Sequence, residues 1–294
     1  MGQMMAPHHI PMTIMEEGRG YEARYCYDDQ METTEYHCHD FYEIYLHLRG
    51  GQYFGLDNNL FLLEPNQVFI LPPFSMHGLS SANPLRQYER AYLNLSPEVL
   101  KTLGCEQIDL DQFFRAYTAQ GLNTFRLSDR DAAQCVAWIH ELEKGPLSGE
   151  PLDRFGHYAV LMNFINVVCQ GIRQSKAVTG GIISNSIILN VLTYINSNYT
   201  QPLKIDQIAK QFGISVSYLS HEFARFTNRS VYDYILYRRV MLARQMMQTD
   251  ASLNAIAYQC GFNDYSNFLR MFNKLVGMSP SRYRKQIKRF DGGR

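Results

Sequence analysis

Two histidines and a glutamate stand close together in the N-terminal part of this 294-residue chain. The segment HCHDFYEIYLHLRG places His37 and His39 one residue apart, and Glu43 follows four residues later. On an extended strand, side chains two residues apart point to the same face, so both imidazoles can converge, and Glu43 joins them if no bulge intervenes. Such a group could hold a metal ion in an enzyme, or it could persist in a protein that does no chemistry. The rest of the chain has to discriminate between these two functions.

Charge is divided unequally along the chain. The totals of 28 basic and 28 acidic residues give a net charge of zero. Residues 1–176 carry 13 basic against 22 acidic residues, whereas residues 177–294 carry 15 against 6. The length is typical of two domains, and the 46% hydrophobic content can fill a core in each. The basic second half is therefore the candidate for binding nucleic acid.

Cysteine spacing and hydropathy exclude several classes of protein. The six cysteines include no CxxC pair, which argues against a zinc ribbon and a disulfide framework. The most extended apolar segment, AVLMNFINVV, is about half of the roughly 20 residues that a membrane span needs. The N-terminus lacks the pattern of a signal peptide. We therefore expect a cytoplasmic protein with reduced thiols.

The first half begins with short segments rich in Tyr, Phe, Ile and Leu that are separated by Gly, Pro and Asn. They read FYEIYLHL, GQYFGL, NLFLLE, QVFILP and ERAYLNL. Short runs with turn residues between them predict an antiparallel β sandwich or barrel, which we place at about residues 20–100.

Helical periodicity follows from about residue 109 to about residue 175. Ser128 and Asp131 form a predicted capping box before AAQCVAWIHEL, and a second helix begins near Pro151-Leu152. The apolar positions of the second helix alternate steps of three and four, as in a coiled coil. These positions are Phe155, Tyr158, Met162, Ile165, Cys169 and Ile172. Two interpretations stay open: the helix packs entirely on its own barrel, or part of it forms a dimer seam.

The second half contains one helical pattern twice. Residues 177–184, with Gly180-Gly181, form the predicted linker to a domain at 185–294. IDQIAKQFGISVSYLSHEFARF fits two short helices around a turn, with Ser215 as the N-cap of the second. IAYQCGFNDYSNFLRMFNKLVG repeats the arrangement, with Asp264 as the cap. Each is a helix-turn-helix whose second helix can enter a major groove, and VYDYILYRRVMLARQMMQ predicts one helix between them.

These motifs resemble those of a known family. The run AYQCGFNDYSNFLRMFNKLVGMSPSRYR closely resembles the signature of the AraC/XylS family of transcription regulators, and ISVSYLSHEFARFTNRSVYDYI is similar to that family's first helix-turn-helix. Asn228 stands where the family usually has Gly, and Asn tolerates a left-handed turn. A linking helix of about 18 residues would be roughly 27 Å long, so it can hold two recognition helices near the roughly 34 Å repeat of B-DNA.

The resemblance implies which side chains of the recognition helices touch DNA. Arg270 is the best candidate for bidentate contact with guanine, while Arg225 and Lys274 are better placed for phosphates. Arg239 matches a family position that looks structural and is left out. The expected base contacts are Ser217, Ser220, His221, Tyr265, Ser266 and Arg270.

The first half resembles the cupin barrels that AraC-type regulators carry as sensor domains. PPFSMH resembles the second cupin motif, with His77 in the place of the remaining metal-binding histidine. Two glycines expected from the motifs are replaced, by Met31 and Phe74. Three imidazoles and one carboxylate would suit Zn²⁺, Fe²⁺, Mn²⁺ or Ni²⁺. The residues of the first motif, H-x-H-x3-E-x6-G, are His37, His39, Glu43 and Gly50.

The same residues fit a second use, as the polar groups of a small-molecule pocket with apolar walls. Sensor domains of the family often keep histidines and a glutamate at these positions as polar groups of a ligand pocket or as part of the strand framework. No metal cofactor is therefore expected. Aromatic walls with an acidic residue suit a sugar or other polyol. The predicted pocket residues are His37, His39, Glu43, Tyr45, Phe54 and His77.

The predicted fold class is α+β, with a cupin-like β barrel and its helices at 1–176 and an all-α DNA-binding domain at 185–294. The predicted function is a DNA-binding transcription regulator that responds to a small molecule and acts as a homodimer. RNA polymerase is a further partner implied by the resemblance. The alternatives are a metal-dependent cupin enzyme fused to a DNA-binding module, and a regulator without a small-molecule effector.

Overall fold

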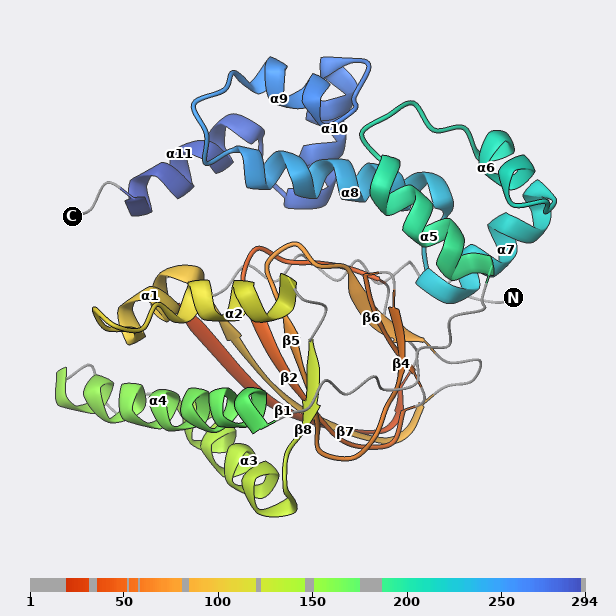
Figure 1. Ribbon diagram of the computed structural model, residues 1–294. Coiled ribbons are helices and arrows are strands. Elements are labelled where there is room, and N and C mark those ends of the chain that lie inside the picture. The colour runs from red at the N-terminus through yellow and green to blue at the C-terminus, as the bar shows by residue number, and fades with distance from the viewer. Residues whose placement is uncertain are drawn as a thin grey trace, which may run out of the picture.

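The computed structural model describes residues 20–31, 36–51, 53–57, 59–80, 85–119, 123–145, 151–174 and 187–291. A β barrel with helices on one side is followed by a helical domain that lies across one end of the barrel (Figure 1). This is the predicted α+β arrangement. The predicted linker at 177–184 lies outside the described residues.

Two antiparallel sheets form the barrel. One has the strand order β1-β7-β2-β5-β8, and the other has the order β4-β3-β6. Every segment that the sequence marks as a strand is present. The strands are β1 (Tyr21–Met31), β2 (Tyr42–Arg49), β3 (Tyr53–Leu56), β4 (Asn59–Leu62), β5 (Gln67–Leu71), β6 (His77–Ser80), β7 (Leu85–Leu95) and β8 (Thr124–Arg126).

The central strands β2 and β5 of the five-stranded sheet are buried on both faces. Ile44 and Leu46 of β2 belong to the hydrophobic core under the helices, whereas Tyr45 belongs to the core inside the barrel, with Phe54 and Phe69. Successive residues of a strand point to opposite faces, so β2 supplies both cores. The side chains inside the barrel are thus mainly aromatic, and β2 also carries Glu43 inward.

Four helices cover the outer face of this sheet (Figure 1): α1 (Pro97–Leu103), α2 (Leu110–Ala119), α3 (Asp129–Lys144) and α4 (Pro151–Gln174). Ser128 caps α3 as predicted, accepting a hydrogen bond from the Asp131 backbone N–H at 3.1 Å. Helix α1, capped by Ser96, and strands β1, β6 and β8 are not among the predicted segments, and β8 pairs with β5. Within the described residues, no helix is long and apolar enough to cross a membrane.

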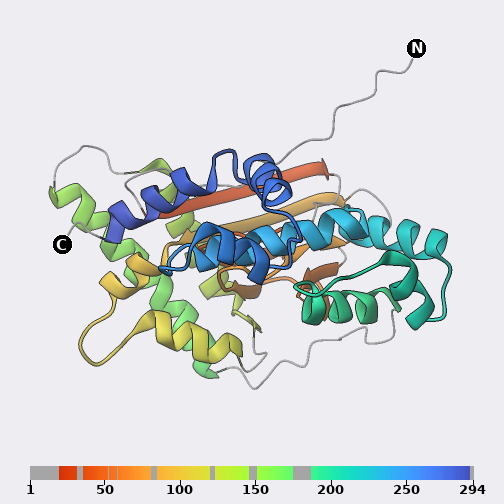
Figure 2. The same ribbon diagram turned by 90° about the horizontal axis from the view of Figure 1, so that it is seen from above.

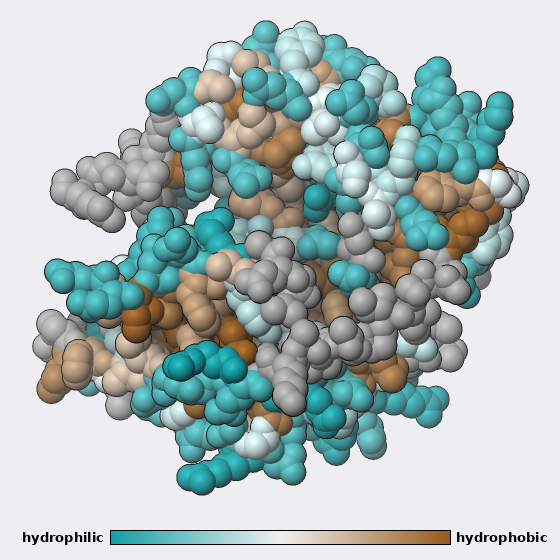
Figure 3. Space-filling model, viewed as in Figure 1, coloured by the Kyte–Doolittle hydropathy of each residue, from teal (hydrophilic) through white to brown (hydrophobic). Residues whose placement is uncertain are grey.

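Helix α4 is only partly covered. Its C-terminal half is buried, at Phe164, Ile165 and Val168, whereas Phe155 is 69% exposed and Met162 is 44% exposed. Figure 3 shows hydrophobic surface at the left end of the barrel domain, where α4 lies in Figure 1. The predicted apolar stripe therefore divides into a packed half and an exposed half.

The helical domain is organised around α8 (Val231–Met246), which crosses above the barrel strands (Figure 2). At 16 residues α8 is shorter than the predicted 18, and its length is about 24 Å. The other helices are α5 (Ile187–Asn198), α6 (Ile205–Gln211), α7 (Val216–Thr227), α9 (Leu253–Gln259), α10 (Tyr265–Val276) and α11 (Pro280–Asp291).

The hydrophobic core of the helical domain extends into the barrel. Tyr36, Cys38 and Met76 from the barrel are buried in the same cluster as Tyr237 and Met241 of α8. The two domains are therefore joined by shared apolar packing as well as by the chain.

Candidate functional site

Two helix-turn-helix units stand at opposite ends of α8, α6–α7 at one end and α9–α10 at the other (Figure 1). The predicted caps are present: the Ser215 side chain accepts from Tyr218 N–H, and Asp264 accepts from the N–H groups of the first turn of α10. Gly213 and Gly261 occupy the two turns with φ of 66° and 89°, a conformation that favours glycine. Asn228 ends α7 with φ of 53°, so it takes the left-handed conformation expected of it.

The predicted base-contacting side chains gather on the outer faces of α7 and α10. Ser217, Ser220 and His221 of α7 are exposed, as are Ser266 and Arg270 of α10. Tyr265 is half-buried because its ring packs against Phe268 at 5.8 Å. The opposite faces of both helices are buried, at Leu219, Phe223, Phe268 and Phe272. The apolar face of each recognition helix is therefore fixed in the core, and its polar face is exposed to solvent.

The charged side chains of these helices differ in their local partners. Lys274 is exposed, and Arg270 donates a hydrogen bond to the Asn267 side chain at 3.0 Å. Arg225 pairs with Glu222 one helical turn away, so its charge is partly balanced. Arg239 donates to the backbone carbonyls of Tyr199 and Gln201, which agrees with its exclusion from the DNA contacts.

Inside the barrel, His39, Glu43 and His77 meet in one group whose ligand atoms all lie within 4.8 Å of one another. Nε2 of His39 lies 2.9 Å from Oε2 of Glu43, and Nε2 of His77 lies 3.6 Å from the same oxygen. His39 and His77 are buried, with exposures of 5% and 2%. The structure thus brings together three of the four predicted ligands.

The second ring nitrogen of each histidine determines the chemistry of this group. Nδ1 of His39 lies 2.9 Å from the Phe41 carbonyl, and Nδ1 of His77 lies 3.1 Å from the Ser75 carbonyl. A carbonyl oxygen only accepts, so both Nδ1 atoms carry protons, and in neutral rings both Nε2 atoms are acceptors. The His77 Nε2 atom is buried without a hydrogen-bond donor or acceptor among the described residues. Metal-binding histidines have this arrangement, with the far N–H on a carbonyl.

Burial and the neighbouring groups act in opposite directions on the pKa values of His39 and Glu43. Burial lowers the pKa of His39, which favours the neutral imidazole, although Glu43 opposes this. Burial by itself would raise the pKa of Glu43, but His39 and His77 outweigh it and hold the pKa below its ordinary value. The ionised Glu43 is therefore stabilised where the imidazole nitrogen that faces it carries a proton, and a divalent cation could take the place of that proton between the carboxylate and the imidazoles.

The other predicted pocket residues surround this group. Phe54 stacks on His77 with ring centroids 6.2 Å apart, and Tyr45 stacks on Phe54 at 5.1 Å. The His37 ring lies 4.5 Å from that of His77 but outside the three-residue group. The prediction that His37 and His39 lie on one strand with Glu43 is wrong in detail, since β2 begins at Tyr42 and His37 forms only an isolated bridge with His77.

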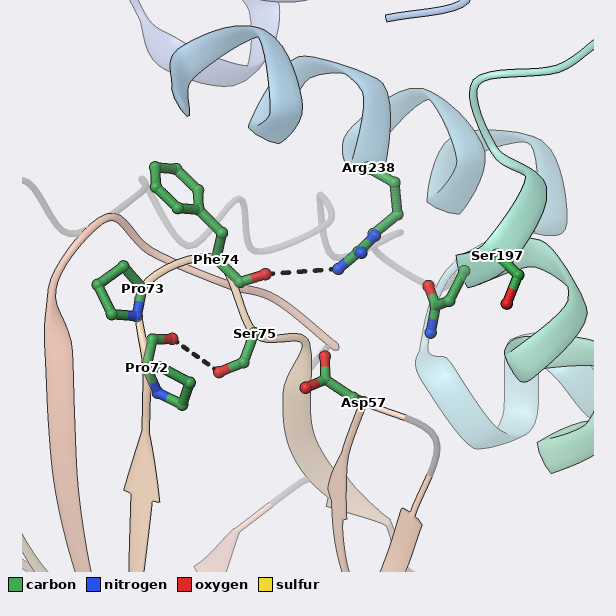
Figure 4. Close-up of a pocket in the computed structure, with 8 residues that line it drawn as sticks. Asp57, Pro72, Pro73, Phe74, Ser75, Ser197 and Arg238 are labelled. Carbon is green, nitrogen blue, oxygen red and sulfur yellow. Dashed lines mark hydrogen bonds between the residues drawn. The ribbon is translucent and has the colours of Figure 1, made fainter. Parts of the chain in front are cut away.

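A pocket of about 420 Å³ lies where the two domains meet, and none of the predicted pocket residues lines it. Figure 4 shows Arg238 of α8 pointing into it, toward Phe74 and Asp57 of the barrel. Arg238 donates to the Phe74 carbonyl at 3.4 Å, and its Nε atom is buried without an acceptor among the described residues. The lining residues are Asp57, Pro72, Pro73, Phe74, Ser75, Asn196, Ser197 and Arg238.

Comparison with known families agrees with the folds of the barrel domain and of the helical domain. A family model described as an AraC-like ligand binding domain matches residues 19–154, and one described as a helix-turn-helix domain matches residues 208–286. The chain belongs to the AraC family of transcription regulators. It is a DNA-binding regulator with an N-terminal ligand-binding domain.

Relatives of this AraC-family regulator fall into two groups by coverage. The regulator YdiP of Escherichia coli is 34% identical over 110 residues, which are 37% of this chain and 36% of YdiP. YfiF of Bacillus subtilis is 25% identical over 87% of this chain and 80% of its own length. The transcriptional activator RhaS of Yersinia pestis is 24% identical over 85% of this chain and 89% of its own length. A structure of ToxT from Vibrio cholerae covers 90% of this chain and 97% of that chain at 14% identity, with a TM-score of 0.38.

Two sets of residues in this AraC-family regulator escaped prediction. Val216 and Tyr218 are 46% and 48% exposed in the first turn of α7, and their positions off the apolar face of that helix could have marked them. The residues that join the domains, including Asp40, Tyr237 and Arg244, have no local sequence signal, because about 200 residues separate the partners.

Proposed function

We propose that this regulator reads two successive major grooves of its operator with the exposed faces of α7 and α10. The observation that carries the proposal is the placement of two capped, polar-faced recognition helices on one continuous helix, α8. N-terminal residues of recognition helices commonly reach base edges, which supports base contacts by Ser217 and Ser266. The full set is Ser217, Ser220, His221, Tyr265, Ser266 and Arg270 for bases, and Arg225 and Lys274 for phosphates.

A gel-shift titration at fixed salt, on DNA from the promoters that adjoin the gene, tests this function. The expected result is at least a thousandfold preference for one of these fragments over scrambled DNA of equal length. Equal affinity for both kinds of DNA would contradict the proposal, because it would leave only the phosphate contacts.

The remaining assignments follow from the family. RhaS is named as an activator, which supports activation through RNA polymerase as the mode of action here. The exposed half of α4 supports a homodimer. We also propose that the protein acts in the cytoplasm by binding rather than by catalysis, since its relatives are named as transcription regulators.

The effector that this proposal assigns to the barrel is a small polyol such as a sugar, bound by His39, Glu43 and His77 among aromatic side chains. A thermal-shift screen of sugars, fatty acids and aromatic acids tests the assignment. His77→Ala should abolish the shift, whereas Arg238→Gln, in the pocket between the domains, should not. The reverse result would move the effector to that pocket, and a screen without any hit would exclude the small-molecule assignment.

A divalent cation is the second candidate for the same residues. It is favoured by the two carbonyl-bound Nδ1–H groups, which leave both Nε2 atoms facing Glu43. Calorimetric titration with Zn²⁺ and Mn²⁺ should show one site that His77→Ala removes and that the matched variant His140→Ala, on the exposed side of α3, retains. DNA binding that responds to the polyol but not to a chelator would exclude the cation as effector.

A further inference from the structure

The segment from Tyr36 to Asp40 has two chemically different faces. His37 and His39 point to the cluster inside the barrel, with their rings 4.5 Å and 4.9 Å from that of His77. The alternate residues Tyr36 and Cys38 are buried in the core that is shared with the helical domain. Asp40 pairs with Arg244 of α8. The alternation of extended backbone thus points one set of side chains into the barrel and the other set toward the core that the two domains share.

The backbone hydrogen bonds of this segment are divided in the same way. His37 exchanges two hydrogen bonds of 2.9 Å with His77, through its N–H and its carbonyl. The Tyr237 hydroxyl of α8 accepts from Cys38 N–H and donates to the Cys38 carbonyl, both at 2.8 Å. The Tyr36 backbone bonds to Thr227 and Arg229 at 2.9 Å and 2.8 Å. One edge of the segment is therefore bound to the barrel, and the other edge is bound to α7, α8 and the turn between them.

Close packing holds the segment rigidly between the domains. The Tyr36 hydroxyl lies against Gly55 of β3 so closely that an added Cβ would overlap it. On its other side, the Tyr36 ring lies 5.5 Å from that of Phe226 in α7. Packed interiors have little free volume, so a displacement of this segment is transmitted to its neighbours on both sides.

We infer that residues 36–40 act as a connector that couples the His39–Glu43–His77 cluster to the docking of the DNA-binding domain through Tyr237 and Arg244. The inference rests on the proposed function, in which α7 and α10 read DNA and the cluster is the sensor. An occupant that enters between His39 and Glu43 breaks their 2.9 Å contact and shifts the backbone on which Tyr237 is bound. Because coupling is reciprocal, DNA binding that strains the docking changes affinity at the cluster by the same factor.

A double-mutant cycle in the full chain tests the connector without any ligand. Glu43→Gln alters the charge of the cluster at constant size, and Tyr237→Phe removes only the hydroxyl that binds Cys38. The matched control is Tyr234→Phe on the same helix, because the buried Tyr234 donates its hydroxyl to Asn196 within the helical domain. Hydrogen exchange of peptides spanning 231–246 and DNA affinity at fixed salt are the two readouts.

Glu43→Gln should change exchange in α8 at least threefold. In the Tyr237→Phe background, the change in exchange caused by Glu43→Gln should be less than half of that in the otherwise unmodified protein. In the Tyr234→Phe background the change should persist. His39→Gln and Asp40→Asn form a second cycle, so the test does not depend on the folding of one variant. Additive effects in both cycles would overturn the connector, because independent distant sites are additive.

The two readouts separate this inference from the proposed function. Hydrogen exchange is measured without DNA. If the effects of the substitutions on exchange are non-additive but the protein shows no site-specific DNA binding, the connector is retained and the proposed function is rejected. Additive exchange together with intact site-specific binding would reject the connector alone.

Discussion

Arg244 of α8 is paired with Asp40 of the barrel, 204 residues earlier in the chain. Arg244 is 4% exposed, and Tyr283 of α11 completes the group by accepting from Arg244 Nε at 3.2 Å and donating to Asp40 at 3.0 Å. Burial by itself would lower the pKa of Arg244, but the Asp40 carboxylate raises it above its ordinary value. A buried charge of the DNA-binding domain is thus neutralised by the sensor domain.

Asp40→Asn should lower the free energy of unfolding by about 1–3 kcal/mol, because a buried guanidinium loses its charged acceptor. Urea denaturation followed by helical circular dichroism measures the change. Asp28→Asn is the matched control, since Asp28 pairs with Arg90 inside the barrel domain at a side-chain exposure of 38%, against 34% for Asp40. The control should cost less than about 1 kcal/mol. Equal losses would contradict a special contribution from the pair between the domains.

Arg270→Ala should cost about 1–3 kcal/mol of operator affinity and relax specificity at one base pair, since it removes the side chain proposed to make bidentate contact with a guanine. Lys274→Ala should weaken binding to all sequences alike and reduce the salt slope by about one. Gel shifts on an operator and its single-base variants, at several salt concentrations, separate the two effects. Unchanged site-specific affinity of the Arg270 variant would show that another residue reads that base.

Stability should fall as the pH drops from about 6.5 to about 4. Burial lowers the pKa of His47 to about 4, whereas an unfolded histidine titrates near 6.5. Between these values the unfolded chain binds more protons at His47 than the folded chain, so the free energy of unfolding decreases with falling pH, and the contribution of His47 levels off below about 4. The loss due to His47 is roughly 3 kcal/mol. Burial lowers the pKa of His39 as well, which acts in the same direction.

Urea midpoints between pH 4 and 8 measure this dependence. His47→Gln should flatten the curve, because the substitution removes the imidazole whose pKa burial lowers. If the His47→Gln variant keeps the full slope of stability against pH, groups other than His47 cause the pH dependence.

Phe155→Glu and Met162→Glu should shift the protein from dimer to monomer, if α4 forms the proposed seam. Both side chains lie on the exposed half of the α4 stripe with Leu152 and Tyr158. Light scattering during gel filtration measures the mass, and Ile108→Glu, at a site 54% exposed outside α4, is the control. A dimer that survives both substitutions, or a monomeric unmodified protein, would exclude this seam.

Local signals in the sequence determined much of the fold. Ser128, Ser215 and Asp264 cap the helices that they precede, because a cap and its N–H donors are two or three residues apart. The turn glycines of both helix-turn-helix units are equally local. Each of these features follows from the backbone geometry of a few neighbouring residues.

Tertiary structure decided what the histidines contact. His39, Glu43 and His77 converge because β2 and β6 meet the segment that precedes β2, and Asp40 meets Arg244 because α8 lies across that segment. Strand β8 exists only because β5 offers a free edge to Thr124–Arg126. Such contacts join residues that are up to about 200 positions apart, and their energy depends on packing that no short window of sequence encodes. The sequence therefore determined which side chains could bind a ligand or DNA, whereas only the folded chain decided that residues 36–40 join the two sites.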